Sequence, residues 1–273
     1  MLSSEASKAL SSEDLRFYAE NGYLVSSTLL NETEKELINT GIQEMETWPE
    51  KSGKWMKYYE PSRQDGTPIL CRIENFIPFS ESLRSILCSD KIFSALEQLL
   101  GEPVCLYKDK INFKLPNANG FSPHQDSPAF RGQAQKNHIT VLIAIDAMTL
   151  ENGCLEIATN RKEVWQQKIT LPHTVKGALL DEIVNELTWA PNIMKPGDIM
   201  FFGSYIPHRS GPNLTQKPRR ALYVTYNPAM EGDKHEQYYQ DKRVAFPPEI
   251  EREPGKDYSD GAKIYNFANP IFD

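Results

Sequence analysis

The sequence predicts an α+β, mainly-β fold in which a double-sheet jelly roll follows a helical N-terminal part. Two observations predict it. Apolar residues recur at helical spacing through the first hundred residues, whereas from Val104 onward short period-2 segments alternate with turns rich in Gly, Pro and Asn. Helices first and many short strands afterwards are typical of a jelly roll with flanking helices.

The N-terminal part is expected to hold several helices. The first begins at a serine cap, residue 11 or 12, and stops at the Asn-Gly pair 21–22. A second is expected over about 31–48, where the apolar residues form one stripe. Residues 49–70 are polar and aromatic, so a loop is expected there. Two short helices follow, the second over 90–100 with a glycine as its stop.

The strands and the tail complete the predicted domain. Five segments have the strand pattern: 104–115, 137–146, 153–158, 198–203 and 219–227. The charged and aromatic residues after them are expected to wrap the core as an ordered tail with little regular structure. We therefore expect a single domain with a helical part (about 1–101), a jelly-roll core (about 102–228) and a wrapping tail (229–273).

Composition limits the class of protein. The net charge of −7 argues against a dedicated nucleic-acid surface. No apolar run approaches the roughly 18 residues that a membrane helix needs, and residues 1–14 lack the pattern of a signal peptide. The four cysteines lie apart, without C-x-x-C spacing, so we expect reduced thiols and no thiolate zinc site. We expect a cytoplasmic monomer or homodimer that binds a small molecule, and neither nucleic acid nor a membrane.

Three residues have the character of a metal site. His124 and Asp126 form an H-x-D pair after a predicted strand and a glycine turn, and His208 follows the later strand 199–202. Two imidazoles and one carboxylate can occupy one face of an octahedral Fe(II), which leaves three positions for a chelating cosubstrate and dioxygen. The alternative is that His124 is a turn histidine capped by Asp126.

Arg219 is the candidate anion-binding residue. It lies eleven residues after His208, at the start of a predicted strand. An arginine inside a barrel is costly unless an anion meets it, and its planar fork matches a carboxylate bidentately, as the distal end of 2-oxoglutarate requires. Because adjacent strand residues face opposite ways, Arg220 is the alternative inward residue.

These residues resemble the phytanoyl-CoA dioxygenase family of Fe(II)/2-oxoglutarate oxygenases. The resemblance implies a double-stranded β-helix (cupin-like jelly roll) and an enzyme that uses Fe(II), 2-oxoglutarate and O2. It also implies that His124, Asp126 and His208 bind iron, and that Arg219 and Ser210 hold the far carboxylate of 2-oxoglutarate. Since related halogenases lack the carboxylate ligand, Asp126 implies hydroxylation. The matching stretches are Ser122–Asp126, Glu151–Leu155, Pro196–Asp198 and His208–Asn213 leading to Arg219.

A cationic strand precedes the metal motif. Period 2 places one set of polar side chains on a single face: Lys108, Lys110, Asn112 and Lys114. If this face lines the barrel, it attracts 2-oxoglutarate and an anionic substrate, with Lys114 nearest the cosubstrate. If the opposite, apolar face points inward, the lysines are merely solvated.

Further pocket residues are expected from two other segments. Thr140, on the small mixed face of the strand from His138, is a candidate donor to the cosubstrate, with ordinary strand polarity as the alternative. Phe130 and Arg131 lie in a candidate lid after the metal motif, where the ring would exclude water and the guanidinium would meet an anion. The other histidines, His138, His173 and His235, are expected to be surface or packing residues.

The resemblance extends to the branch of the family that hydroxylates small aminoalkyl-phosphonates. It rests on the run Lys110–Lys114 and on the tail from Tyr226 to Tyr239. The implied substrate is small and anionic or zwitterionic, such as 2-aminoethylphosphonate or an N-methylated analogue. Three alternatives stay open: a hydroxylase of another small metabolite or acyl thioester, a zinc hydrolase, and a non-catalytic jelly-roll metal-binding module.

Overall fold

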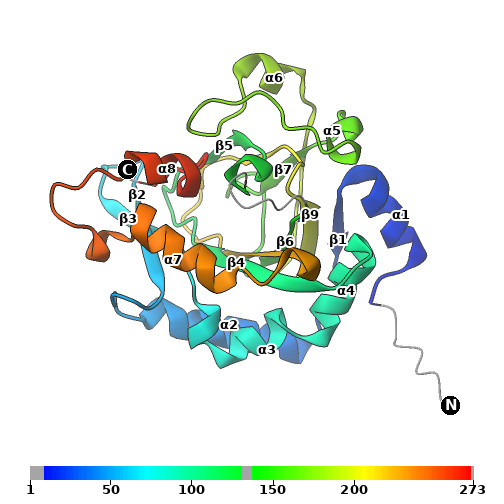
Figure 1. Cartoon of the computed structure of the whole chain (residues 1–273), viewed down its shortest axis with the longest axis horizontal. Helices are drawn as coiled ribbons and strands as arrows, with labels where there is room; N and C mark the ends of the chain where they lie inside the picture. Colours follow the sequence, from blue (N-terminus) through cyan, green and yellow to red (C-terminus); the bar gives the residue numbers. More distant parts are fainter. Residues whose placement is uncertain (1–8, 131–136, 272–273) are drawn as a thin grey trace.

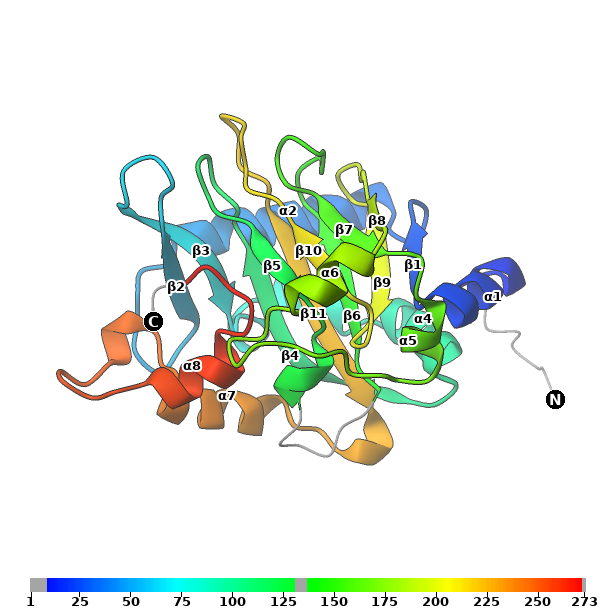
Figure 2. The ribbon, with the colours of Figure 1, turned by 90° about the horizontal axis from the view of Figure 1, so that it is seen from above.

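The chain folds into two antiparallel β-sheets that face each other, with helices outside them (Figures 1 and 2). A computed structural model describes residues 9–130 and 137–271. The larger sheet has the order β1-β9-β6-β11-β4-β3-β2, and the smaller one the order β5-β10-β7-β8. The strands are β1 (Tyr23–Ser26), β2 (Met56–Pro61), β3 (Pro68–Glu74), β4 (Val104–Asn112), β5 (Phe121–His124), β6 (Ile139–Ala144), β7 (Leu155–Ala158), β8 (Trp189–Pro191), β9 (Ile199–Gly203), β10 (His208–Ser210) and β11 (Ala221–Pro228).

The N-terminal helices begin and end where their capping residues predict. Ser11 accepts a hydrogen bond from the Asp14 amide at the start of the first helix, and Gly22 ends this helix with φ 75°. Gly101 ends the fourth helix with φ 79°. The helices are α1 (Ser12–Asn21), α2 (Glu32–Thr47), α3 (Glu81–Leu87), α4 (Asp90–Leu100), α5 (Lys162–Gln166), α6 (Asp181–Glu186), α7 (His235–Ala245) and α8 (Ser259–Tyr265).

Helices α2, α3 and α4 cover the outer face of the larger sheet (Figure 1). Their buried side chains, Ile42 and Leu96 among them, form one core with Ile111 of β4 and Val224 of β11. Because Ile111 faces this core, its neighbours Lys110 and Asn112 face the space between the sheets. The apolar face of β4 is thus satisfied by the helices, and its polar face lines the interior.

Two regions differ from the sequence-based expectation. The expected loop 49–70 contains β2 and the start of β3, which extend the larger sheet. Its strands were missed because their buried sides are partly polar: Glu60 and Arg72 are at most 2% exposed. The tail contains α7, whose buried residues are two tyrosines and a lysine, and α8, whose buried residues are a glycine and an alanine, so neither helix has an apolar stripe that would predict it.

The jelly roll itself agrees with the predicted fold class. All five segments predicted as strands contain one, whereas β8 and β10, three residues each, are too short to show a period. Pairing of β1, β2 and β3 with this sheet shows that the N-terminal part is not purely helical; the division into parts at 101 and 228 stays a prediction.

Within 9–130 and 137–271, none of the helices has the length and apolar character needed to cross a membrane.

Candidate active site

Three side chains of the smaller sheet converge on one point. His124 ends β5, His208 begins β10, and the two residues are direct partners in the antiparallel register. Asp126 follows two residues after His124, and the ligand atoms of all three lie within 4.8 Å of one another. The Nδ1 atoms of His124 and His208 lie 2.7 and 2.9 Å from the carbonyl oxygens of Ser122 and Ile206. Since a carbonyl only accepts, each Nδ1 carries the proton and each Nε2 is left to bind a metal.

Burial sets the protonation of these groups. It lowers the pKa of His124 to about 3, with the neighbouring His208 adding to the effect, and it lowers the pKa of His208. Burial opposes ionisation of Asp126, but His208 and Lys108 outweigh it and hold the pKa of that carboxyl below its usual range. Two neutral imidazoles beside one carboxylate are the donor set of a non-haem Fe(II) site, so the residues present fit this metal.

Arg219 lies inside the protein, and no carboxylate of the described residues forms an ion pair with it. Its side chain is 0% exposed, and its Nη1 donates to the hydroxyl of Tyr223 over 3.4 Å. Its Nε and Nη2 atoms have no hydrogen-bond partner within 9–130 and 137–271. Arg220 points the other way, where its guanidinium contacts Asp146 at 2.8 Å and Glu46 at 2.7 Å. A buried guanidinium with two open donors on one edge fits a bidentate carboxylate.

Lys114 connects Arg219 to the loop after β10. Its ammonium donates to the Ser210 hydroxyl over 2.7 Å and to the Gly211 carbonyl. Burial, together with the charge of Arg219, lowers the pKa of Lys114 well below its usual range. The lysine therefore orients the hydroxyl of Ser210 while Arg219 keeps its donors open.

An inner cavity lies between the sheets beside the three convergent residues. Thr140 is on its wall, with its hydroxyl 3.0 Å from that of Thr225. The cavity is lined by Lys108, Lys110, Asn112, Phe121, His124, Asp126, Thr140, Leu155, Phe202, His208, Arg209, Ser210, Tyr223 and Thr225. The cavity thus brings together the three convergent residues His124, Asp126 and His208 (the triad), Ser210, Thr140 and the polar face of β4. Arg219 contacts the lining residue Tyr223.

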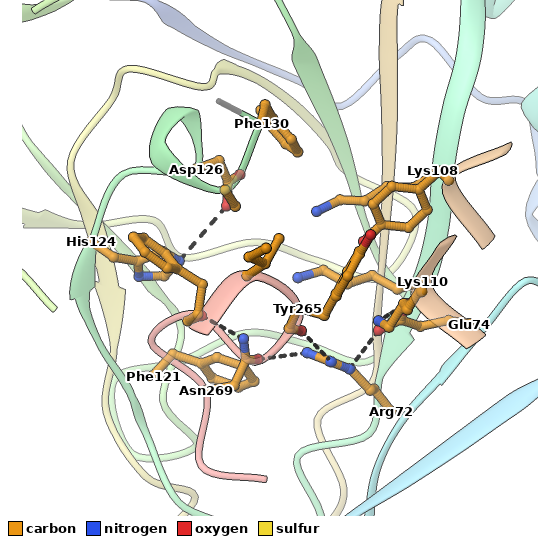
Figure 3. A pocket seen from close by; sticks show the side chains of 15 residues that line it. Arg72, Glu74, Lys108, Lys110, Phe121, His124, Asp126, Phe130, Tyr265 and Asn269 are labelled. Atoms are coloured by element: carbon orange, nitrogen blue, oxygen red, sulfur yellow. Dashed lines mark hydrogen bonds and ion pairs between the residues drawn. The ribbon is translucent and has the colours of Figure 1, made fainter. Parts of the chain in front are cut away.

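An outer chamber adjoins the inner cavity and shares its triad side (Figure 3). The side chains of Lys108 and Lys110 reach into it toward Asp126. Its other walls come from distant parts of the chain, β3 and the C-terminal segment. These distant walls are Arg72, Glu74, Tyr238, Lys242, Ile264, Tyr265, Phe267 and Asn269, and the remaining lining residues, Phe121, His124, Ala129 and Phe130, come from β5 and the turn after it.

Cations outnumber carboxylates in the outer chamber. Glu74 lies between Arg72, at 2.6 Å, and Lys242, at 2.5 Å. These two charges overcome the effect of burial and lower the pKa of Glu74 to about 2. Lys108 and Lys110 form no ion pair within the described residues, and burial lowers the pKa of Lys110 to about 8. The chamber therefore holds two ammonium groups without an ion-pair partner of their own; the carboxylate that acts most strongly on both is Asp126, which is also a candidate metal ligand.

The remaining predicted residues lie as follows. Phe130 is 2% exposed and lines the outer chamber, with the Lys108 ammonium 4.9 Å from its ring centre. Arg131 lies outside the described residues. His138 stacks on Phe130 at 4.1 Å, and His235 contacts Asp109 at 2.6 Å, away from the triad.

Sequence reasoning missed the residues that β3 and the tail contribute to the chamber. Arg72 and Glu74 have period-2 spacing, which a strand reading of 68–74 would have placed on one face. No sequence signal connects them with Tyr265 and Asn269, nearly two hundred residues later.

Comparison with known proteins identifies the family. The phytanoyl-CoA dioxygenase (PhyH) family matches residues 18–221. The chain is 42% identical to 2-aminoethylphosphonate dioxygenase of uncultured bacterium HF130_AEPn_1 (93% of this chain, 95% of the relative). It is 40% identical to methylphosphonate hydroxylase of Gimesia maris (87% and 88%). The structure of EctD from S. alaskensis with 2-oxoglutarate and 5-hydroxyectoine has the same fold (TM-score 0.68, 16% identity, 83% of this chain, 79% of that one). The chain belongs to the phytanoyl-CoA dioxygenase family and is an Fe(II)/2-oxoglutarate-dependent dioxygenase.

Proposed function

We propose that this enzyme hydroxylates a small phosphonate such as 2-aminoethylphosphonate or an N-methylated analogue, with release of succinate and CO2. The observation that carries the proposal is the pair of ammonium groups of Lys108 and Lys110, which lie in the chamber beside the triad and form no ion pair among the described residues. Relatives named for 2-aminoethylphosphonate and methylphosphonate support the same class.

The charges of the site match a dianion. Four cationic side chains line the outer chamber, namely Arg72, Lys108, Lys110 and Lys242, against the carboxylates of Glu74 and Asp126. The formal charge is thus two positive. Fe(II) and the dianion 2-oxoglutarate compensate each other, and Arg219 and Lys114, which we assign to 2-oxoglutarate, lie outside this count, so the chamber's own excess remains for the substrate. A phosphonate dianion neutralises it, whereas an uncharged substrate would leave buried cations unpaired.

The aromatic walls suit the other end of an aminoalkyl-phosphonate. Glu74 is already shared by two cations, so an ammonium finds no open carboxylate on the described walls other than Asp126. Ring faces attract such a cation, and they do so also when its nitrogen is methylated and cannot donate. The available rings are Phe121, Phe130, Tyr238, Tyr265 and Phe267.

We assign the site residues to two tasks. His124, Asp126 and His208 would hold the iron, and Arg219, Ser210, Lys114 and Thr140 would hold 2-oxoglutarate. Bound Fe(II) supplies the activation of dioxygen, coupled to decarboxylation of 2-oxoglutarate. The protein's own residues fix the geometry, and Lys108, Lys110 and Asn112 orient the substrate while Phe130 excludes water.

The remaining expectations concern the setting. We propose a cytoplasmic monomer or homodimer that does not bind nucleic acid. The net charge of −7 and four unpaired cysteines, all within the described residues, support this.

The test is a substrate panel. The enzyme is purified anaerobically, loaded with Fe(II) and 2-oxoglutarate, and assayed for succinate and hydroxylated product. 2-Aminoethylphosphonate, its N-methylated analogues, methylphosphonate and an acyl thioester are compared, with Asp126→Ala as the inactive control. We expect succinate formation coupled to a phosphonate. Coupling to the acyl thioester alone, or to none of the phosphonates, contradicts the proposal.

A further inference from the structure

Arg72 belongs to the same interior face as the lysines of β4. In the antiparallel register of β3 and β4, Arg72 pairs with Asn112 and Glu74 pairs with Lys110. Paired residues point to the same side of a sheet, so Arg72 and Glu74 face the outer chamber next to the β4 side chains. The side chain of Arg72 is 2% exposed and lines the chamber directly.

The C-terminal segment fixes the orientation of this guanidinium. Nη1 of Arg72 donates to Oδ1 of Asn269 over 2.9 Å, and Nη2 donates to the Tyr265 carbonyl over 2.9 Å. Asn269 is itself oriented, because its amide nitrogen donates to the Phe267 carbonyl. Figure 3 shows Asn269 and Tyr265 between Arg72 and the triad side of the chamber.

A second anchor holds the far side of this segment. The Ala268 amide donates to the Lys176 carbonyl over 2.8 Å. A Cβ added to Gly177 would come within 2.4 Å of the Phe267 ring, so the glycine lets the loop and the segment approach closely. Residues 265–269 thus bridge the outer chamber between this loop and Arg72.

We propose that Arg72 is a specificity-determining residue that binds the anionic group of the substrate, and that Asn269 positions it. The inference rests on the phosphonate function proposed above. A guanidinium has five N–H donors. Asn269 and the Tyr265 carbonyl engage one donor each, whereas Nε lies 2.6 Å from a Glu74 carboxylate oxygen but has no hydrogen-bond partner among the described residues. One donor on each Nη therefore remains for an oxyanion. The neutral amide of Asn269 holds the guanidinium without cancelling its charge.

The decisive variants are Asn269→Asp and Asn269→Ala. Both variants lose the N–H that Asn269 donates to the Phe267 carbonyl. Asp keeps the shape and strengthens the bond to Arg72, but its charge competes with the substrate for the guanidinium. If Asn269 were only structural, Asp would be tolerated better than Ala. Anion recognition predicts the reverse: KM for the phosphonate rises more in Asn269→Asp, by about 10–100-fold, than in Asn269→Ala. Asn39→Asp adds the same charge on an exposed helix position and serves as control.

Arg72→Gln supplies the direct test, with the exposed Arg63→Gln as its control. We expect KM for the phosphonate to rise by about 10–100-fold while the KM for 2-oxoglutarate stays unaltered. An unaltered phosphonate KM, or a lower KM in Asn269→Asp than in Asn269→Ala, overturns the role of Arg72. If Arg72→Gln does not fold, the Asn269 pair decides. Wild-type enzyme that turns over no phosphonate overturns the proposed function, and this inference with it.

Discussion

Replacing Arg219 with methionine should separate cosubstrate binding from folding. Nε and Nη2 of Arg219 lie on one edge of the guanidinium and have no hydrogen-bond partner in the part of the chain that the structure describes. A carboxylate that meets this edge accepts two charge-assisted hydrogen bonds, each worth about 1.5–3 kcal/mol. Loss of both removes about 3–6 kcal/mol, which raises the Kd of 2-oxoglutarate by a factor of about 10²–10⁴.

The same substitution should not destabilise the protein without cosubstrate. Arg219 is 0% exposed, and among the described residues its guanidinium forms one hydrogen bond, to the Tyr223 hydroxyl. Methionine fills a similar volume and needs no counter-ion, so the free energy of unfolding should stay equal or increase. Affinity and stability therefore change in opposite directions, which a general disruption of the fold would not produce.

The assay combines titration calorimetry of 2-oxoglutarate into metal-loaded, oxygen-free protein with thermal unfolding. Excess 2-oxoglutarate should raise the unfolding midpoint of the wild type but not that of Arg219→Met. Arg220→Met is the matched control, because Arg220 contacts Asp146 and Glu46 outside the cavity. If Arg219→Met binds 2-oxoglutarate as tightly as Arg220→Met does, the guanidinium is not the carboxylate site and the reasoning fails.

Three further predictions concern the metal, the outer chamber and the backbone. Asp126→Ala should lose Fe(II) content, measured by metal analysis, and all succinate formation; retained turnover would show that the carboxylate is not a ligand. Because burial lowers the pKa of Lys110 to about 8, its charge is present below that pH and is lost above it. The phosphonate KM should therefore rise between pH 7 and 9, and Lys110→Met should flatten this rise; an identical pH profile in the variant speaks against it. Gly153→Ala should cost about 1–3 kcal/mol of unfolding free energy in denaturant titration, because φ is 73° and the added Cβ would lie 2.1 Å from the Gly211 carbonyl oxygen. Gly66→Ala has a similar φ with open space around it, so an equal loss there would leave only backbone strain as the cause.

The cosubstrate side of the site was predictable because its residues are tied to local patterns. His124 and Asp126 are two residues apart, and Arg219 follows His208 by eleven residues, just before β11 begins. Because the helices cover Ile111, strand alternation places the polar face of β4 toward the interior. Spacing alone could not choose between the two faces, because both are buried in a covered sheet.

The outer chamber was not predictable, because its residues come from segments that lie far apart in the sequence. Its strand β3 carries buried Arg72 and Glu74, and the expectation that strand interiors are apolar concealed it. These charges are tolerated inside because Glu74 is paired with Arg72 and with Lys242 of α7, far along the chain. A single sequence contains no sign of such pairing between segments that are distant in the chain.

The part of the chain that matches the family contains only some of the residues of the outer chamber. The family match covers residues 18–221 and stops at the start of β11, before α7 and α8. It therefore includes the triad and Arg219 but leaves out Lys242, Tyr265 and Asn269, which close the outer chamber. The candidate metal and cosubstrate residues thus lie in the matched part. If the substrate occupies the outer chamber as proposed, it meets the unmatched tail. We therefore expect that exchanging the tail between related enzymes changes substrate preference while the triad still binds Fe(II).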